Sequence, residues 1–434
     1  MAPSSGCPCT DAGTCETGLV CLAQTCVSLA GNAAGSGGRG GGSGGAAAGG
    51  GGSGQGDGGG GGIIGSGAIA GQSGGTGGGI AGQSGGTGGG IAGQSGGMGG
   101  AIVVRPMNRD VDILFMVDNS GSMREEQAKL RKSFPTLIDA LRALPGGLPN
   151  LHIGVISSDV GAGNVFISGN PACNRPGGDR GQLQVKKGCG LNAQSNFLIS
   201  LNGDTQKNFS GKLEDVFACI ADLGTSGCGF EHQLQSIRVA LAETFTPSNA
   251  GFLRKDALLV IIMVTDEDDC SGPSVSDFYT DPAFGDGQTG SLRCNIAGHL
   301  CNGAPPPNNP FMTPLQNCVA APRGRLIDVQ ELTSFVLGLK RAPEQIIVSA
   351  ITGVPGDRAN ATYAFVSLMQ PQGSSLLDVE PVCNAGIDGT AAPSLRIGEF
   401  VQAFGANGSL ESICDKDFSN AFIKVAAKIA QHIR

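Results

Sequence analysis

The sequence predicts a doubly wound α/β fold, with a mainly parallel central sheet flanked by helices and with long loops stapled by disulfides. Its strand candidates read as continuous apolar runs, which is typical of a parallel sheet covered on both faces. Amphipathic segments of helical spacing separate these runs, which favours helices packed on both sides of the sheet. Cysteines recur in the long stretches between them, and this indicates loops closed by disulfides.

The first hundred or so residues differ from this fold in composition. Residues 1–30 form a small Cys-rich unit, which is too short to build a core and would need disulfides to hold it. Residues 31–104 are a Gly-rich linker in which residues 67–77 recur as 78–88 and 89–99 with few changes. Each repeat offers one Ile against many glycines, so we expect a disordered tether. The folded domain is therefore predicted over residues 105–434.

Strands and helices alternate along this domain. Apolar runs predict buried strands at residues 111–117, 151–157, 257–265 and 346–351. Apolar residues at helical spacing predict helices at residues 130–144, 230–245, 332–339 and 418–433. Pro135 predicts a kink in the first helix. The stretches that lack either pattern are rich in Gly, Pro, Asn and Asp and are expected to be loops decorating one face: residues 159–205, 270–328 and 354–396.

The cysteines of the folded domain are even in number, which suits five disulfides and an oxidising compartment. A zinc site at Cys294, His299 and Cys301 is the alternative, although no two-plus-two ligand spacing completes it. No signal peptide precedes Cys7, so an extracellular, cell-surface or periplasmic location is inferred from the cysteines, with a leader expected upstream of Met1. The residues around Cys7 are similar to the end of a lipobox, which would make the protein a bacterial lipoprotein.

Composition and charge exclude several classes of function. The net charge of −8 disfavours a nucleic-acid partner, which would select a basic face, and it suits a bound divalent cation. The longest apolar run, residues 257–264, is too short to span a membrane, so no transmembrane segment is predicted. Catalysis is not expected. A hydrolase is disfavoured because the serines around Ser120 lack a G-x-S-x-G elbow, and no oxyanion hole can be located.

Two predicted strands end in polar residues that indicate a metal site. The first strand leads directly into Asp118, Ser120 and Ser122, and the strand at residues 257–265 leads into Asp266. Ligands of doubly wound sheets bind beyond the carboxyl ends of the strands, so adjacent strands would bring these side chains together. Carboxylate and hydroxyl oxygens are hard ligands, which suit Mg²⁺, Mn²⁺ or Ca²⁺ rather than zinc.

The motif D-x-S-x-S after the strand VDILFMV, followed by a helix and a later strand that ends in Thr-Asp (VIIMVTDED), resembles the von Willebrand factor A family, which includes integrin I domains. The resemblance covers about residues 108–434 and implies a Rossmann-like fold with a metal-ion-dependent adhesion site. It implies that Ser120 and Ser122 bind the cation through their hydroxyls, while Asp118 and Asp266 lie near it, often acting through water. The cation, Mg²⁺ first and Ca²⁺ or Mn²⁺ as alternatives, would bind an acidic group of a protein ligand or a surface glycan.

One element departs from the family pattern. The family supplies a threonine from a Gly-Thr loop immediately before a helix, whereas here four residues separate Thr225 from Phe230. Thr225 is expected to complete the site, with Glu231 as the alternative ligand, and a Cys219–Cys228 disulfide would reshape this loop. The competing hypothesis is a structural or scaffolding domain that keeps the fold with an impaired metal site.

Structural roles also fit some of these residues. Ser122 and Glu125 have the spacing of a capping box at the start of a helix, which is compatible with metal binding. Residues 267–269 are interpreted as a solvated acidic turn rather than as further ligands.

Overall fold

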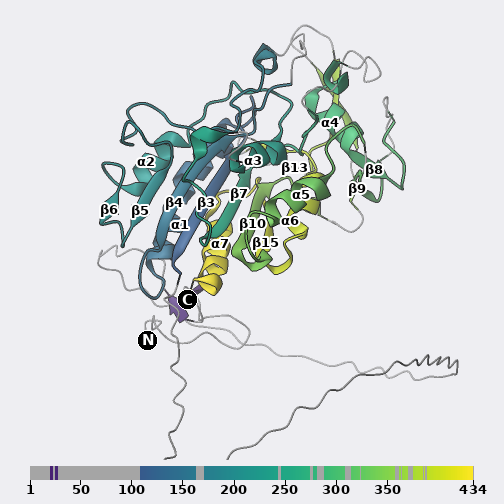
Figure 1. Cartoon of the computed structure of the whole chain (residues 1–434). Coiled ribbons are helices and arrows are strands. Elements are labelled where there is room, and N and C mark those ends of the chain that lie inside the picture. The colour runs from purple at the N-terminus through teal and green to yellow at the C-terminus, as the bar shows by residue number, and fades with distance from the viewer. Residues whose placement is uncertain are drawn as a thin grey trace, which may run out of the picture. The chain divides into compact units, whose positions relative to one another are not determined.

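The structure is a computed structural model that describes residues 20–22, 25–27 and 108–433, apart from residues 163–170, 243–245, 274–276, 281–287, 308–313, 323, 357–360, 363, 370–374, 385 and 387–388. A mixed seven-stranded sheet lies at its centre, with the strand order β15-β10-β7-β3-β4-β5-β6 (Figure 1). Its strands are β3 (Asp110–Val117), β4 (Asn150–Ser157), β5 (Leu198–Leu201), β6 (Gln206–Lys207), β7 (Leu258–Val264), β10 (Ile346–Thr352) and β15 (Gly408–Ser412). The strands from β15 to β4 are parallel, whereas β5 and β6 pair antiparallel at one edge. The predicted α/β class with a mainly parallel sheet is confirmed.

The direction in which the chain winds reverses next to β3. From β3 the chain continues to β4, β5 and β6 on one side, and it later builds β7, β10 and β15 on the other side. The crevice between the carboxyl ends of β3 and β7 is therefore a topological switch point, the place where open α/β sheets bind their ligands. The sequence prediction that these two strands are adjacent is confirmed.

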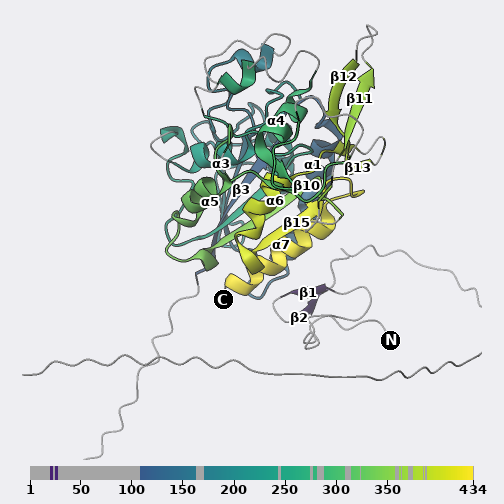
Figure 2. The same cartoon turned by 90° about the vertical axis from the view of Figure 1, so that its right-hand side faces the viewer.

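Helices cover both faces of the sheet because the side chains of its central strands are apolar on both sides (Figures 1 and 2). Phe115 of β3 belongs to one core, whereas its neighbours Leu114 and Met116 belong to the other. The first core is shared with α1 (Arg124–Arg142), α2 (Leu213–Ile220) and α7 (Ser419–His432). The second core is shared with α3 (Gln233–Leu241), α5 (Val329–Leu337) and α6 (Leu395–Gln402).

Short elements occur within the stretches that were expected to be loops. They include α4 (Gly290–Gly298) and the antiparallel pairs β8 (His299–Cys301) with β9 (Cys318–Ala320), β11 (Phe365–Met369) with β12 (Ser375–Val379), and β13 (Cys383–Asn384) with β14 (Thr390–Ala391). Several of them share a third core, in which Tyr279 and Leu292 are buried. These stretches are therefore structured parts of the fold.

Near the start of the chain, β1 (Val20–Leu22) pairs antiparallel with β2 (Thr25–Val27). The other residues up to 107 lie outside the described part of the chain, and so do the predictions about the Cys-rich unit and the Gly-rich repeats. Among the described residues, no helix is both long and apolar enough to cross a membrane.

All ten cysteines of the folded domain form disulfides: Cys173–Cys228, Cys189–Cys219, Cys270–Cys294, Cys301–Cys318 and Cys383–Cys414. The prediction of five disulfides is confirmed, and it indicates an oxidising, extracellular setting. The zinc alternative is wrong, because Cys294 and Cys301 are each bonded to another cysteine. The expected Cys219–Cys228 disulfide is also wrong, because each of these cysteines is bonded to a more distant part of the chain.

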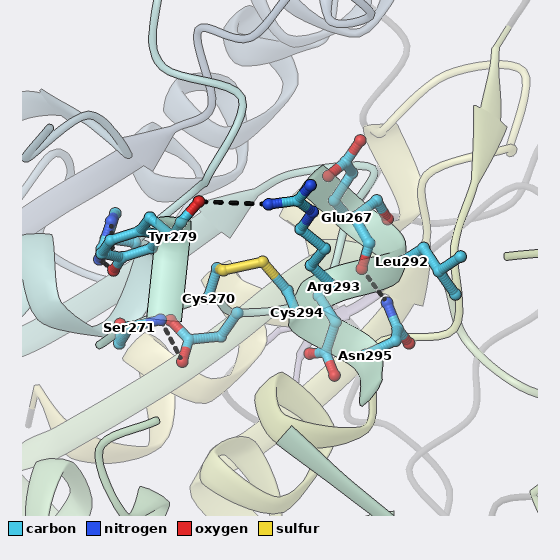
Figure 3. The surroundings of a disulfide bond; sticks show 12 residues. Glu267, Cys270, Ser271, Tyr279, Leu292, Arg293, Cys294 and Asn295 are labelled. Carbon is cyan, nitrogen blue, oxygen red and sulfur yellow. Dashed lines mark hydrogen bonds between the residues drawn. A yellow bond between two sulfur atoms is a disulfide. The ribbon is translucent and has the colours of Figure 1, made fainter. Parts of the chain in front are cut away.

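Figure 3 shows how one of these disulfides ties α4 to the chain that leaves β7. Cys270 is bonded to Cys294 of α4, and the neighbouring Arg293 donates a hydrogen bond to the carbonyl oxygen of Tyr279 (3.2 Å). The disulfide and the hydrogen bond together attach α4 to the segment that follows β7.

Candidate metal centre

The ends of β3 and β7 meet directly in the crevice. Val117 lies opposite Val264 in the parallel register, and the backbone N–H of Asp118 donates to the carbonyl oxygen of Val264 (2.9 Å). The hydroxyl of Thr265 donates to Asp118 Oδ2 (2.7 Å). The residue before Asp266 thus contacts the Asp118 carboxylate, as expected if the two acidic residues belong to one site.

The turn after β3 places two hydroxyl groups next to the Asp118 carboxylate. Asp118 Oδ1 accepts hydrogen bonds from the backbone N–H of Ser120 (2.8 Å) and from the hydroxyl of Ser158 (3.2 Å). The Oγ atoms of Ser120 and Ser122 are 3.3 Å apart. Asp118 and Ser120 are buried, whereas Ser122 is exposed. The two hydroxyls therefore lead from the buried carboxylate to the solvent.

Ser122 does not cap the following helix. Helix α1 begins at Arg124, and its N-cap residue Met123 makes no side-chain capping hydrogen bond. The capping-box interpretation of Ser122 and Glu125 is therefore wrong. The hydroxyl of Ser122 instead faces Ser120 and interacts with Asp266.

Asp266 is a buried carboxyl group that lacks a complete set of partners. It is 5% exposed, and its Oδ1 atom has no hydrogen-bond partner among the described residues. Burial raises the pKa of Asp266 well above its usual value, and the nearby charges of Asp118 and Glu267 raise it further. Burial also raises the pKa of Asp118. A proton or a cation is required to neutralise this pair.

Two more carboxyl groups lie close to this pair. Glu231 is 1% exposed, and within the described part of the chain its carboxyl group interacts with the carboxyl group of Glu267 and has no other hydrogen-bond partner. Burial raises the pKa of Glu231 well above its usual value, with further contributions from Glu267 and Asp118. Burial likewise raises the pKa of Glu267 to about 7. The carboxyl end of β7 thus gathers acidic groups whose ionisation is unfavourable without a cation.

The loop that carries Thr225 lies beside the turn after β3. Gln127 of α1 donates through Nε2 to the carbonyl oxygens of both Asp118 and Gly224 (2.9 Å each). The backbone N–H of Gly227 donates to the carbonyl oxygen of Asn119 (2.8 Å). These bonds bring half-buried Thr225 to the rim of the site, although they hold its loop through the backbone. Gln127 was not among the predicted site residues; the signal that points to it is its position in the first turn of α1, five residues after Ser122.

Asp268 and Asp269 are structural, and their interpretation as part of a solvated turn is wrong. They are 2% and 1% exposed. Asp268 accepts hydrogen bonds from the backbone N–H groups at the start of α6, including that of Arg396 (3.0 Å), and from His299 Nε2 (2.7 Å). Asp269 accepts a hydrogen bond from Arg396 Nη2 (2.9 Å). The partners in α6 are more than a hundred residues away and His299 is 31 residues away, so no local pattern could reveal them.

The side-chain oxygen atoms at this site can hold a hard cation only if hydroxyl groups are among the ligands. Within the described ranges, no three side chains of His, Cys, Asp or Glu are close enough together to hold a metal ion. A cation would therefore need Ser120, Ser122 and water in addition to the acidic residues, as fits Mg²⁺, which keeps several of its waters. The chain matches no protein-family model, and no curated protein matches it, so the functional interpretation depends on the chemistry of these residues.

Proposed function

We propose that this chain is an exported protein-binding module of the von Willebrand factor A type, which presents a divalent cation at the carboxyl ends of β3 and β7. The five disulfides support export, because such bonds persist in oxidising compartments. The topological switch point between β3 and β7 supports the position of the site. The D-x-S-x-S turn supports its chemistry.

The observation that carries the proposal is a buried carboxyl oxygen without a partner inside a cluster of acidic groups. Buried polar atoms are nearly always hydrogen-bonded, and buried charges are paired or coordinate metals. Here Asp266 Oδ1 lacks a partner in the described structure, and the hydroxyl of Ser122 lies beside this carboxyl group. The Glu231 carboxyl interacts with that of Glu267, which is another acidic group. A divalent cation at this position would neutralise the carboxylates and give the hydroxyls a ligand role.

The proposed neutral and charged ligands differ in how they bind the cation. Ser120, Ser122 and Thr225 would hold the cation through neutral hydroxyl oxygens, while Asp118 and Asp266 would act mainly through water. A cation with few direct anionic ligands stays electrophilic, so it can bind a carboxylate from outside at an open coordination position. Ser122 is exposed, which supports an opening on its side of the proposed site. The partner is therefore an acidic group, Mg²⁺ is the preferred cation, and Mn²⁺ or Ca²⁺ are the alternatives.

Calorimetric titration of the metal-free full chain tests the proposal. We expect one Mg²⁺ to bind and to raise the midpoint of thermal unfolding, because a ligand of the native state alone stabilises it. Mn²⁺ is expected to do the same, whereas an excess of EDTA should reverse the shift. If none of Mg²⁺, Mn²⁺ and Ca²⁺ gives heat or a thermal shift, the alternative of a scaffolding domain with an impaired site replaces the proposal.

Replacing Thr225 and Glu231 separately decides which of them completes the site. We expect Thr225→Val to weaken Mg²⁺ binding about tenfold, as loss of a supporting metal contact commonly does. Glu231→Gln is expected to change the affinity less and to stabilise the metal-free protein, because it removes one of several buried like charges. Calorimetry and urea unfolding measure the two effects. If Glu231→Gln weakens Mg²⁺ binding more than Thr225→Val does, Glu231 is the ligand. The cation would then carry one more anionic ligand and would attract an external carboxylate less strongly.

A further inference from the structure

Arg175 is a cationic residue close to the turn that carries Ser120 and Ser122. Its Nη2 atom donates to Asp159 Oδ2 (2.9 Å) and to Asp179 Oδ1 (2.6 Å). The other oxygen of Asp179, Oδ2, lies 3.5 Å from Asn119 Nδ2 and accepts a hydrogen bond from Ser157 Oγ (2.6 Å). Asn119 is the second residue of the D-x-S-x-S motif. A single carboxylate therefore separates Arg175 from the turn of the candidate metal centre.

The segment that carries Arg175 is also attached to the loop that carries Thr225. Two residues before Arg175, Cys173 forms a buried disulfide with Cys228, which lies three residues after Thr225. The backbone packs closely here, since a Cβ atom added to Gly161 would lie 2.4 Å from the carbonyl oxygen of Arg175. Gly161 also has a φ of +65°, which other residues rarely adopt. The backbone at Arg175 is thus fixed relative to the Thr225 loop, which itself contacts Asn119.

The guanidinium of Arg175 is held but not covered. Its side chain is 56% exposed, whereas that of Asp159 is 1% exposed. In the residues that the structure describes, its ion pairs use Nη2 alone, so Nη1 and Nε can donate to a molecule from solution. Asp159 and Asp179 orient the guanidinium and partly neutralise its charge. Arg175 would therefore affect the orientation of a bound partner more than the affinity.

We propose that Arg175 is a second anchor for the acidic partner, so that the site selects a protein segment with two neighbouring carboxylates. One carboxylate would bind the cation and the other would bind Arg175, which deepens the proposed function and rests on it. Arginine suits this role because its planar group donates hydrogen bonds in fixed directions. A protein segment is favoured over a sugar acid because sugar sites commonly stack an aromatic ring on the sugar. The chain has no Trp, and of its two tyrosines Tyr279 is buried while Tyr363 lies outside the described residues.

A peptide array with the Mg²⁺-loaded full chain tests this inference. The peptides carry no Asp, one Asp, or two Asp residues at increasing separation. We expect the wild-type protein to bind the best two-Asp peptide about fivefold more tightly than the one-Asp peptide, as fits a partly exposed ion pair. Arg175→Gln should abolish this preference while it leaves Mg²⁺ binding and one-Asp binding unchanged. Arg180→Gln is the matched control, because Arg180 is exposed, lies in the same segment and forms no ion pair with a described residue.

The outcomes separate this inference from the proposed function. If Arg175→Gln keeps the two-Asp preference, or weakens all peptides and Mg²⁺ equally, the second anchor is wrong while metal-dependent binding stands. If the wild-type protein binds neither Mg²⁺ nor any acidic peptide, the proposed function itself fails. Tighter binding of polygalacturonate than of every peptide would overturn the choice of a protein partner.

Discussion

Asp118→Asn is expected to abolish Mg²⁺ binding and at the same time to stabilise the metal-free protein. Asparagine has the shape of aspartate and can still accept the hydrogen bond from the backbone N–H of Ser120. It removes a charge that is fully buried and that raises the pKa values of Asp266 and Glu231. We expect Mg²⁺ affinity to fall at least about 100-fold. The free energy of unfolding without metal should rise by about 1 kcal/mol.

Asp118→Asn is also expected to change how the stability of the metal-free protein depends on pH. Glu267 has a pKa of about 7 in the folded protein, and the pKa values of Asp118, Glu231 and Asp266 are raised as well. The metal-free folded state therefore binds more protons than the unfolded state above the ordinary carboxyl range. The contribution of these carboxyl groups to stability should fall as the pH rises from about 4.5 through 7, whereas His232, with a pKa lowered to about 4, contributes in the opposite direction. Asp118→Asn should make this fall smaller, as urea unfolding in EDTA at several pH values would show.

Asp112→Asn is the matched control for Asp118→Asn. Asp112 lies near the start of β3 and Asp118 directly follows its end, and both are fully buried. Asp112 forms an ion pair with Arg254 (2.7 Å). The control should lower stability and leave Mg²⁺ affinity unchanged. Equal Mg²⁺ binding by wild type and Asp118→Asn, or a loss of several kcal/mol in the metal-free variant, would contradict the proposed role of Asp118.

Strong local patterns explain why much of the fold could be predicted from the sequence. Apolar runs identified β3, β4, β7 and β10, whose residues are almost all buried, and the polar residues that follow two of these runs pointed to the crevice. The missed strands β5 and β15 are short and lie toward the edges, where only part of each strand is buried. They form because β4 and β10 offer unpaired edges, which is tertiary information.

Two missed helices show a different limit. In α2, Leu213, Val216, Phe217 and Ile220 have clear helical spacing, so its signal was present but short. In α6, the apolar residues begin inside a stretch interpreted as a loop, and the start of the helix is held by Asp268, more than a hundred residues earlier. A cap supplied from so far away leaves no trace in the local sequence.

The disulfide pairing and the environment of the acidic residues were beyond local patterns for the same reason. Cys228 is near Cys219 in the sequence but is bonded to Cys173, because the loops meet over the end of β4. Among the consecutive acidic residues 266–269, Asp266 lies at the candidate metal centre, whereas Asp268 and Asp269 face α6. Adjacent residues of one type therefore differ in role because the folded chain surrounds them differently.

Asp269→Ala is expected to cost about 3 to 5 kcal/mol of unfolding free energy, because it leaves a buried guanidinium without its partner. The side chains of Asp269 and Arg396 are 0% and 1% exposed, and they form an ion pair of 2.9 Å. Asp269 also accepts hydrogen bonds from the backbone N–H of Leu234 at the start of α3 (2.9 Å) and from the hydroxyl of Ser271 (2.6 Å). One carboxylate thus joins α3, α6 and the segment after β7.

Urea unfolding of the metal-free protein measures this cost, and Asp256→Ala is its control. Asp256 pairs with Arg341 at the surface, where both side chains are about two thirds exposed, so its loss should cost less than about 1 kcal/mol. The double replacement Asp269→Leu with Arg396→Met should recover part of the stability, because it removes both charges together but leaves the buried N–H of Leu234 without its acceptor. A loss below about 1 kcal/mol for Asp269→Ala would mean that water reaches Arg396. The segment that holds Asp266 would then be too loose to fix a cation above β7.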